Sequence, residues 1–294
     1  MSLTPMKFPK ARPRYRLSNL TRFVAALLVF LLAVTAVFVV IAKNKEKPSD
    51  QNPVVVTPVV MPTSEPTPPP IEIPDGKSME QVLVVIDAGH GGRDPGTTSP
   101  YTKNFYEKDI TLYIAKRVEE LLIDKEIKVI LTREEDDHLN DVIKEDLIAR
   151  AEVGNSNNAS LFVSIHVNAY DLKYKGAAGV NGMEVYYLNK KATYTDFTEE
   201  RFAQIVGDEI NKTTGIKFNG VKSNGLSVLR NTVMPAILVE TGYITNKDDH
   251  ARLSSTDFKD KTAQGIAEGI TLALQEIDAF EYDGAMYVFK EVGE

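Results

Sequence analysis

From residue 80 onward, short apolar runs alternate with longer segments whose apolar side chains recur every three or four residues. Continuous runs of this length predict buried strands, and the longer period predicts helices that each bury one face. The predicted strands are 82–86, 128–132, 161–166, 183–188, 226–229 and 236–239. The predicted helices are 107–123, 142–153, 199–212 and 257–277. Because strands alternate with helices, we expect an α/β fold with a mostly parallel twisted sheet and helices on both faces.

A single apolar run precedes this pattern, because residues 23–42 contain no charged side chain. At 1.5 Å per residue in a helix, such a run matches the roughly 30 Å core of a bilayer. Six basic and no acidic residues come before it, which predicts a cytoplasmic N-terminus over 1–22 and a transmembrane anchor over 23–42. The alternative is a cleaved signal peptide, but its apolar core is normally only about 7–15 residues.

The next segment, 43–79, is rich in proline: nine of the fifteen prolines lie between Pro48 and Pro74. Such a segment predicts an extended extracellular linker rather than a helix or a central strand. A single globular domain is then expected over 80–279. The C-terminal tail, 280–294, is either an added edge strand or a loose end.

Composition narrows the classes of function. The chain contains no cysteine, which excludes disulfides, thiolate zinc sites, iron–sulfur clusters and a cysteine nucleophile. The whole chain carries a formal net charge of −7, and region 80–294 alone carries −12. An acidic exported domain is a poor partner for nucleic acid, so no nucleic-acid binding is expected.

Three predicted strands end in residues that can carry chemistry. VLVVIDAGH ends at His90, LFVSIH ends at His166 and PAILVE ends at Glu240. If these strands are parallel neighbours, their carboxyl ends meet at one edge of the sheet, where open α/β sheets form their sites. Three glycines flank His90, and we expect them to let the backbone turn sharply and leave the imidazole uncovered.

Two histidines at one sheet edge indicate a metal. A catalytic zinc usually has three protein ligands and one open position for water. Glu107 is the best third ligand, because it begins a predicted helix whose dipole favours a carboxylate. His138 and His250 lie among acidic residues, which is typical of solvated surface. Glu240 is then the candidate general base that takes the proton of a bound water.

Each of these residues also has a structural interpretation when taken singly. A histidine after a strand is more often a hydrogen-bonded structural residue than a ligand. The neighbours Asp87, Arg93 and Asp94 either orient the imidazole of His90 or belong to a turn, and the turn is favoured.

Two arginines are candidates for pairing with a substrate carboxylate. Arg150 lies on a predicted helix, which favours an internal salt bridge instead. Arg230 follows a predicted strand near the expected site edge and is kept as the weaker candidate.

Several segments occur in the order found in one known family. They are IDAGHGGRDPGT, YEKD followed by an amphipathic helix, FVSIHVNA, GMEVYYL, VLRNTVMPAILVETGYITN and the closing helix. Region 80–277 resembles the zinc-dependent N-acetylmuramoyl-L-alanine amidases of bacterial cell walls, the type-3 amidases. The resemblance implies a phosphorylase/hydrolase-like α/β fold, Zn²⁺ as cofactor, metal ligands at His90, Glu107 and His166, and a catalytic glutamate at Glu240.

The resemblance also implies a reaction and a place. The expected substrate is peptidoglycan, cleaved at the amide between N-acetylmuramic acid and L-alanine of the stem peptide. The expected location is the cell membrane, with a single span, a cytoplasmic N-terminus and the catalytic domain facing the wall. Some members carry a long helical insert that blocks the site. Only sixteen residues without helical periodicity separate His166 from Met183, so the site is expected to be open, or controlled by location or by a protein activator outside the cell.

Other functions fit parts of the sequence. A catalytically silent amidase-like domain would bind peptidoglycan or activate a partner hydrolase, but all the expected site residues are retained. Zinc carboxypeptidases pair a histidine with a glutamate three residues later, whereas residue 93 is arginine. A dinucleotide loop requires G-x-G-x-x-G, and Asp94 takes the position of the third glycine. The amidase is therefore favoured, and the silent binding domain is the alternative.

Overall fold

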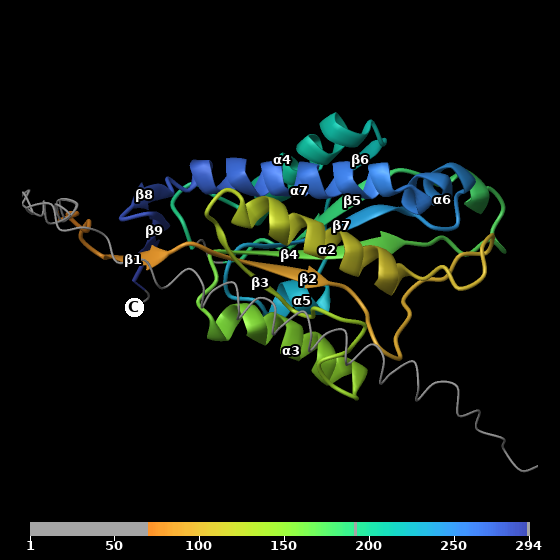
Figure 1. Cartoon of the computed structure of the whole chain (residues 1–294), viewed down its shortest axis with the longest axis horizontal. Helices are drawn as coiled ribbons and strands as arrows, with labels where there is room; N and C mark the ends of the chain where they lie inside the picture. The colour runs from red at the N-terminus through yellow and green to blue at the C-terminus, as the bar shows by residue number, and fades with distance from the viewer. Residues whose placement is uncertain (1–69, 191–192, 293–294) are drawn as a thin grey trace, which may run out of the picture. The chain divides into compact units, whose positions relative to one another are not determined.

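The computed structural model describes residues 70–292 apart from 191–192, which form a mixed α/β domain (Figure 1). The central sheet has six strands in the order β3-β2-β4-β7-β5-β6. Its strands are β2 (Leu83–Ala88), β3 (Lys128–Leu131), β4 (Leu161–Asn168), β5 (Met183–Tyr187), β6 (Phe218–Ser223) and β7 (Ala236–Tyr243). The first four strands of this order are parallel, and β5 pairs antiparallel with β7. The expected mostly parallel sheet is confirmed, with a reversal at β5 that the pattern did not predict.

Helices cover both faces of this sheet, as expected (Figure 1). One face carries α2 (Glu107–Ile123), α4 (Glu199–Thr214) and α7 (Thr256–Glu276). The other face carries α3 (Ile143–Ser156) and α5 (Ser227–Asn231). The short helix α6 (Lys247–Ser254) links β7 to α7, and a single 3₁₀ turn, Ala177–Gly179, lies between β4 and β5.

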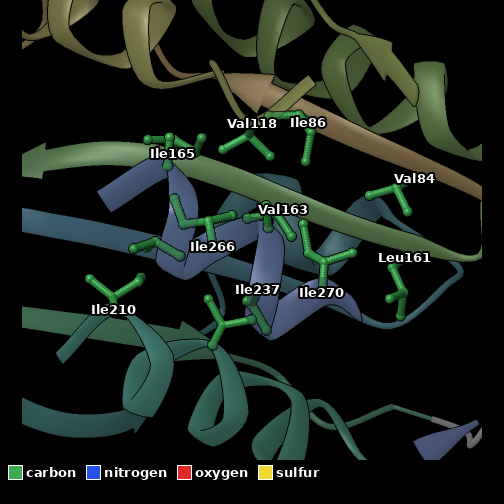
Figure 2. Packing of buried hydrophobic residues seen from close by; sticks show 14 of the residues in the cluster. Val84, Ile86, Val118, Leu161, Val163, Ile165, Ile210, Ile237, Ile266 and Ile270 are labelled. Atoms are coloured by element: carbon green, nitrogen blue, oxygen red, sulfur yellow. The ribbon is translucent and has the colours of Figure 1, made fainter. Parts of the chain in front are cut away.

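The larger core lies between the sheet and α7, where Val163 and Ile165 of β4 pack with Ile266 and Ile270 (Figure 2). The intervening β4 residue Phe162 faces the opposite layer, because side chains alternate along a strand. A sheet covered on both faces gives continuous apolar strands, which is why these runs were readable in the sequence. The same alternation places His166 on the α3 side, four positions beyond Phe162.

Most predicted elements are confirmed to within a few residues, and α2 has the predicted bounds. The strand predicted at 226–229 is wrong, because this segment forms helix α5. Four apolar residues do not distinguish a strand from a helical turn. Strand β6 and helix α6 were not predicted. Both are largely polar, and α6 begins where the Asn246 side chain accepts two backbone N–H groups rather than where an apolar pattern starts.

A second, smaller sheet lies beside the start of β2 (Figure 1). It has the order β1-β9-β8, with β1 (Lys77–Gln81), β8 (Phe280–Tyr282) and β9 (Ala285–Glu291) all antiparallel. The tail from Phe280 therefore forms strands instead of a loose end. Strand β9 pairs with β1 and β8 pairs with β9, so neither joins the central sheet.

The predicted N-terminus 1–22, the anchor 23–42 and most of the linker 43–79 lie outside the described residues. Within 70–292, every described helix is too short or too polar to cross a bilayer.

A buried ion pair joins the central sheet to α3. Arg150 is 2% exposed, with its NH1 3.0 Å from Asp87 Oδ1 and its Nε 2.7 Å from Asp146 Oδ2. The same guanidinium donates to the carbonyl oxygens of Ala88 and His90, each at 2.8 Å. Burial raises the pKa of Asp87, but the charge of Arg150 and two hydroxyl donors hold it below its usual value. The internal salt bridge predicted for Arg150 is confirmed, and it fixes the loop that carries His90.

We predict that Arg150→Ala lowers the free energy of unfolding by about 3–5 kcal/mol, because it leaves the Asp87 carboxylate buried without a counter-charge. Denaturant unfolding measures the effect. The exposed Arg230→Ala is the control, with an expected change of about 0.5 kcal/mol or less. Equal, small losses in both variants would show that the pair does not hold the loop.

Candidate active site

Three side chains from separate elements meet at the carboxyl edge of the sheet. Glu107, at the start of α2, places its Oε1 3.2 Å from His90 Nε2 and 2.9 Å from His166 Nδ1. One ligand atom from each of the three residues lies within 4.8 Å of the others. These are the three residues that the sequence indicated as metal ligands, and the structure brings them together.

Strand order explains this convergence. Strands β2, β4 and β7 are adjacent and parallel, as the site prediction required. His166 and Glu240 are paired directly across β4 and β7, so their side chains emerge on the same face. Gly89 donates its N–H to Ile165 O at 3.0 Å, which places His90 just beyond the end of β2 and beside His166.

The glycines make room for the ligand side chains. A Cβ on Gly89 would lie 2.5 Å from the ring of His166. A Cβ on Gly96 would lie 2.5 Å from Glu107 Oε2 and 2.7 Å from His90 Cδ2. His90 itself has a φ of 61°, a left-handed conformation that only a tightly constrained loop maintains in a residue with a side chain. The glycines therefore serve close packing around the cluster as well as the turn itself.

Hydrogen bonds orient the cluster from outside. His90 Nδ1 lies 2.8 Å from Asp94 Oδ2, which leaves Nε2 to face Glu107. Carboxylate partners of this kind fix the tautomer and orientation of metal-binding histidines. Glu107 accepts the backbone N–H of Thr97 at 2.7 Å and that of Val167 at 2.8 Å. Each carboxylate oxygen of Glu107 is thereby held by the backbone of a neighbouring element.

The three charged residues near His90, which were expected to be turn residues, differ in their roles. Asp94 lies in a turn, as favoured, where it exchanges two backbone hydrogen bonds with Gly91, but it also orients His90. Asp87 belongs to the buried pair with Arg150. Arg93 is largely exposed, 3.5 Å from Asp141. Among these neighbours, only Asp94 contacts the imidazole.

The cluster perturbs its own ionisation. Burial lowers the pKa of His90, but hydrogen bonds and charge from Glu107 and Asp94 raise it to about 9. Burial raises the pKa of Glu107, but hydrogen bonds from His166 and His90 hold it well below its usual range. Glu107 is therefore a stable anion at the centre of the cluster, as a ligand for a cation must be.

Glu240 behaves in the opposite way. Its Oε2 is buried and has no hydrogen-bond partner among the described residues. Burial raises the pKa of Glu240, positive charge on His166 and His90 lowers it, and the carboxylates of Glu107 and Glu184 raise it, to about 7 in all. A carboxyl group that titrates near neutral pH is suited to accept and return a proton.

The His90–Glu107–His166 cluster and Glu240 line the same cleft. An open cavity of about 430 Å³ is lined by the three clustered residues together with Glu240, Asn168 and Ala169. A smaller cavity of about 150 Å³ lies on the other side of His90 and His166, against α3. Between β4 and β5 the chain forms only the 3₁₀ turn Ala177–Gly179, so the described segment after His166 contains no blocking helix.

Other residues considered from the sequence lie outside this cluster. Arg230 is exposed on α5 and donates to Gly225 O. Its predicted pairing with a substrate carboxylate rested on a strand at 226–229, and this segment is helical. His138 is partly buried and pairs with Asp141 at 3.0 Å, and His250 packs against Tyr101. Neither histidine is simply solvated, but neither joins the His90–Glu107–His166 cluster.

Sequence reasoning missed Arg133. This buried residue donates from Nε to Ala88 O at 2.8 Å and from NH2 to Gly89 O at 3.1 Å. It therefore holds the same loop as Arg150, from the other side. The sequence could have pointed to Arg133, because it directly follows the predicted strand 128–132. His90 and His166 were identified by a similar position at the end of an apolar strand.

The family profile described as N-acetylmuramoyl-L-alanine amidase matches residues 84–272. The chain belongs to this family. The matched region contains the whole His–Glu–His cluster and Glu240, so the recognition made from the sequence motifs is confirmed.

Two proteins with similar sequences are longer than the region that they share with this chain. The endolysin of Bacillus phage SPP1 is 40% identical over 192 residues, covering 64% of this chain and 64% of the phage protein. LytC of Bacillus subtilis is 34% identical over 186 residues, covering 63% of this chain but 34% of LytC. The chain thus spans less than two thirds of the length of either relative.

Solved structures agree with the fold. The catalytic domain of CwlV from Bacillus (Paenibacillus) polymyxa var. colistinus is 37% identical with a TM-score of 0.57, covering 66% of this chain and 98% of that domain. The CwlD amidase from Clostridioides difficile, solved in complex with the GerS lipoprotein, is 29% identical with a TM-score of 0.59, covering 66% and 99% of the two chains.

The raised pKa of Glu240 predicts a pH-dependent stability of the metal-free protein. The folded state holds this proton more tightly than the unfolded state, so its stabilising effect is complete below about pH 4.5 and is lost as pH rises through about 7. The glutamine of Glu240→Gln cannot ionise. Between pH 5 and pH 8, the free energy of unfolding of this variant should therefore fall by about 2–3 kcal/mol less than that of the unmodified chain.

Denaturant unfolding in the presence of a chelator, at both pH values, measures this difference. The exposed Glu281→Gln is the matched control and should follow the unmodified chain. Parallel losses for Glu240→Gln and the unmodified chain would mean that burial does not perturb this carboxyl group.

Proposed function

We propose that this chain is a zinc-dependent N-acetylmuramoyl-L-alanine amidase that cleaves the amide between N-acetylmuramic acid and L-alanine of the peptidoglycan stem peptide. The observation that carries the proposal is the combination, in one open cleft, of the His90–Glu107–His166 cluster with the unpartnered carboxylate of Glu240. Family membership supports this bond as the target.

Zn²⁺ fits the residues present. Two imidazole nitrogens and one carboxylate oxygen form a donor set of catalytic zinc sites, and Asp94 supplies the outer carboxylate that such sites use to orient a histidine. We assign His90, Glu107 and His166 as the ligands. When bound, zinc lowers the pKa of water towards neutral and stabilises negative charge on a carbonyl oxygen.

Glu240 performs the proton transfers in this proposal. Its buried Oε2 has no hydrogen-bond partner among the described residues, so it accepts a proton from the water that attacks the lactyl carbonyl carbon. It then donates that proton to the alanine nitrogen as the carbon–nitrogen bond breaks. The products are a lactyl carboxylate on the glycan and a stem peptide with a free amino group.

The position of the enzyme in the cell is part of the same proposal. The apolar segment 23–42 with its basic flank supports a single membrane anchor, and the proline-rich segment after it supports an extracellular spacer. The catalytic domain would then act on the wall from the membrane surface. A protein regulator outside the cell has one support, the solved complex of the similar CwlD amidase with GerS.

We predict that Glu240→Gln retains one zinc per chain but loses at least about 100-fold in kcat, because no group accepts the proton. His166→Ala should lose both zinc and activity. Zinc content by elemental analysis and release of stem peptides measure the two effects, with Glu281→Gln as the control. Full activity in Glu240→Gln would remove it as the base.

Product analysis tests the function itself. The zinc-loaded full chain is incubated with peptidoglycan, and the soluble fragments are identified by mass. The amidase releases stem peptides that begin with L-alanine and leaves glycan without peptide. Binding to peptidoglycan without any release would instead support the silent binding domain.

A further inference from the structure

Three tyrosines and a leucine lie exposed on the surface beside the cleft, with the ion pair of Asp171 and Lys173 among them. Tyr101, Tyr170, Leu172 and Tyr174 are 40%, 44%, 43% and 57% exposed, and we call these four residues the aromatic rim. Tyr170 and Tyr174 form an edge-on pair with ring centroids 6.3 Å apart. Large apolar side chains gathered at one place on a surface mark a binding site more often than isolated ones do.

The rim is continuous with the cleft. Tyr170 directly follows Ala169, and Tyr101 lies four residues after Thr97; both Ala169 and Thr97 line the cleft. The two loops meet at Thr245, whose carbonyl accepts the Tyr101 hydroxyl at 2.6 Å and whose hydroxyl accepts the Tyr170 N–H at 2.9 Å. Tyr101 and Tyr170 therefore lie side by side at the border of the cleft.

The loop that carries three of the four rim residues is held in place. Gly182 donates its N–H to the buried Asp249 at 2.7 Å, and the Asn246 side chain donates to Ala178 O at 2.8 Å. The ring of Tyr101 packs edge-on against His250 with centroids 5.2 Å apart. A surface fixed in this way loses little conformational entropy when it binds a ligand.

The chemistry of the rim selects among the parts of the substrate. Stem peptides carry carboxylates, whereas glycan strands present apolar C–H faces of pyranose rings with hydroxyls at the edges. A tyrosine ring offers an apolar face and a polar hydroxyl. The charged neighbours of the rim, Asp171 and Lys173, pair with each other at 2.5 Å, and Lys173 Nζ lies 5.0 Å from the centroid of the Tyr174 ring. These two charges therefore offset each other beside the rings. We propose that the aromatic rim binds the glycan strand next to the muramic acid whose amide is cleaved. This inference rests on the proposed function.

The test compares a polymeric with a minimal substrate for the zinc-loaded full chain. The substrates are soluble, uncross-linked glycan strands that bear stem peptides, and a muramoyl tripeptide with a single sugar. For Tyr170→Ala/Tyr174→Ala we expect a rise in KM on the order of tenfold on the strands, with kcat unchanged. On the muramoyl tripeptide, which does not reach the rim, both constants should stay the same.

Two control variants sharpen the comparison. Tyr113→Ala removes a tyrosine of similar exposure, 37%, from α2, where it bonds Asp260, and it should behave as the unmodified chain. Tyr170→Phe/Tyr174→Phe keeps the ring faces and should retain most of the affinity.

The remaining outcomes overturn the proposal. An unchanged KM on the strands would mean that the rim does not touch glycan and would favour a protein partner as its occupant. An equal loss on both substrates would mean that the rim only shapes the cleft. If the unmodified chain cleaves neither substrate, the proposed function fails. Co-sedimentation with peptide-free glycan strands then tests the rim separately, and equal retention of the unmodified chain and the alanine variant would refute it.

Discussion

A single carboxylate oxygen, Oε1 of Glu107, lies between two imidazoles, one on the loop after β2 and one on β4, and the rest of the site depends on this contact. It requires β2 and β4 to be parallel neighbours, α2 to begin at their carboxyl ends, and the backbone between them to carry no side chain at two points of contact. A packed sheet with helices on both faces supplies the first two conditions. The glycine loop supplies the third.

The charged residues near the site have two roles: the arginines hold the loop that carries His90, and the glutamates belong to the site itself. Arg150 and Arg133 bind the carbonyl oxygens of residues 88–90 from two sides, so the loop that carries His90 is held by buried cations. Glu107 is stabilised as an anion, whereas burial keeps Glu240 protonatable near neutral pH. Two carboxyl groups whose environments move their pKa values apart are typical of a site in which one group binds and the other transfers protons.

The sequence was sufficient for the clustered residues and Glu240, but not for the residues that support them. His90, His166 and Glu240 were readable because each ends a strongly apolar strand, and Glu107 because it opens a clear amphipathic helix. The roles of Asp94 and Arg133 depend on how one loop folds over another, which no periodicity encodes. Strand β6 and helix α6 were missed because they are polar. The segment 226–229 was misassigned because a four-residue apolar run fits both a strand and a helical turn. The aromatic rim needed the fold as well, since Tyr101 and Tyr170 are distant in sequence and meet only through Thr245.

X-ray absorption at the zinc edge of the loaded full chain reports the ligands of the metal without relying on activity. We predict two imidazole nitrogens and one carboxylate oxygen among these ligands, with loss of one imidazole in His90→Ala. A spectrum without imidazole scattering, or one that His90→Ala leaves unchanged, would contradict the assignment of the cluster as the metal centre.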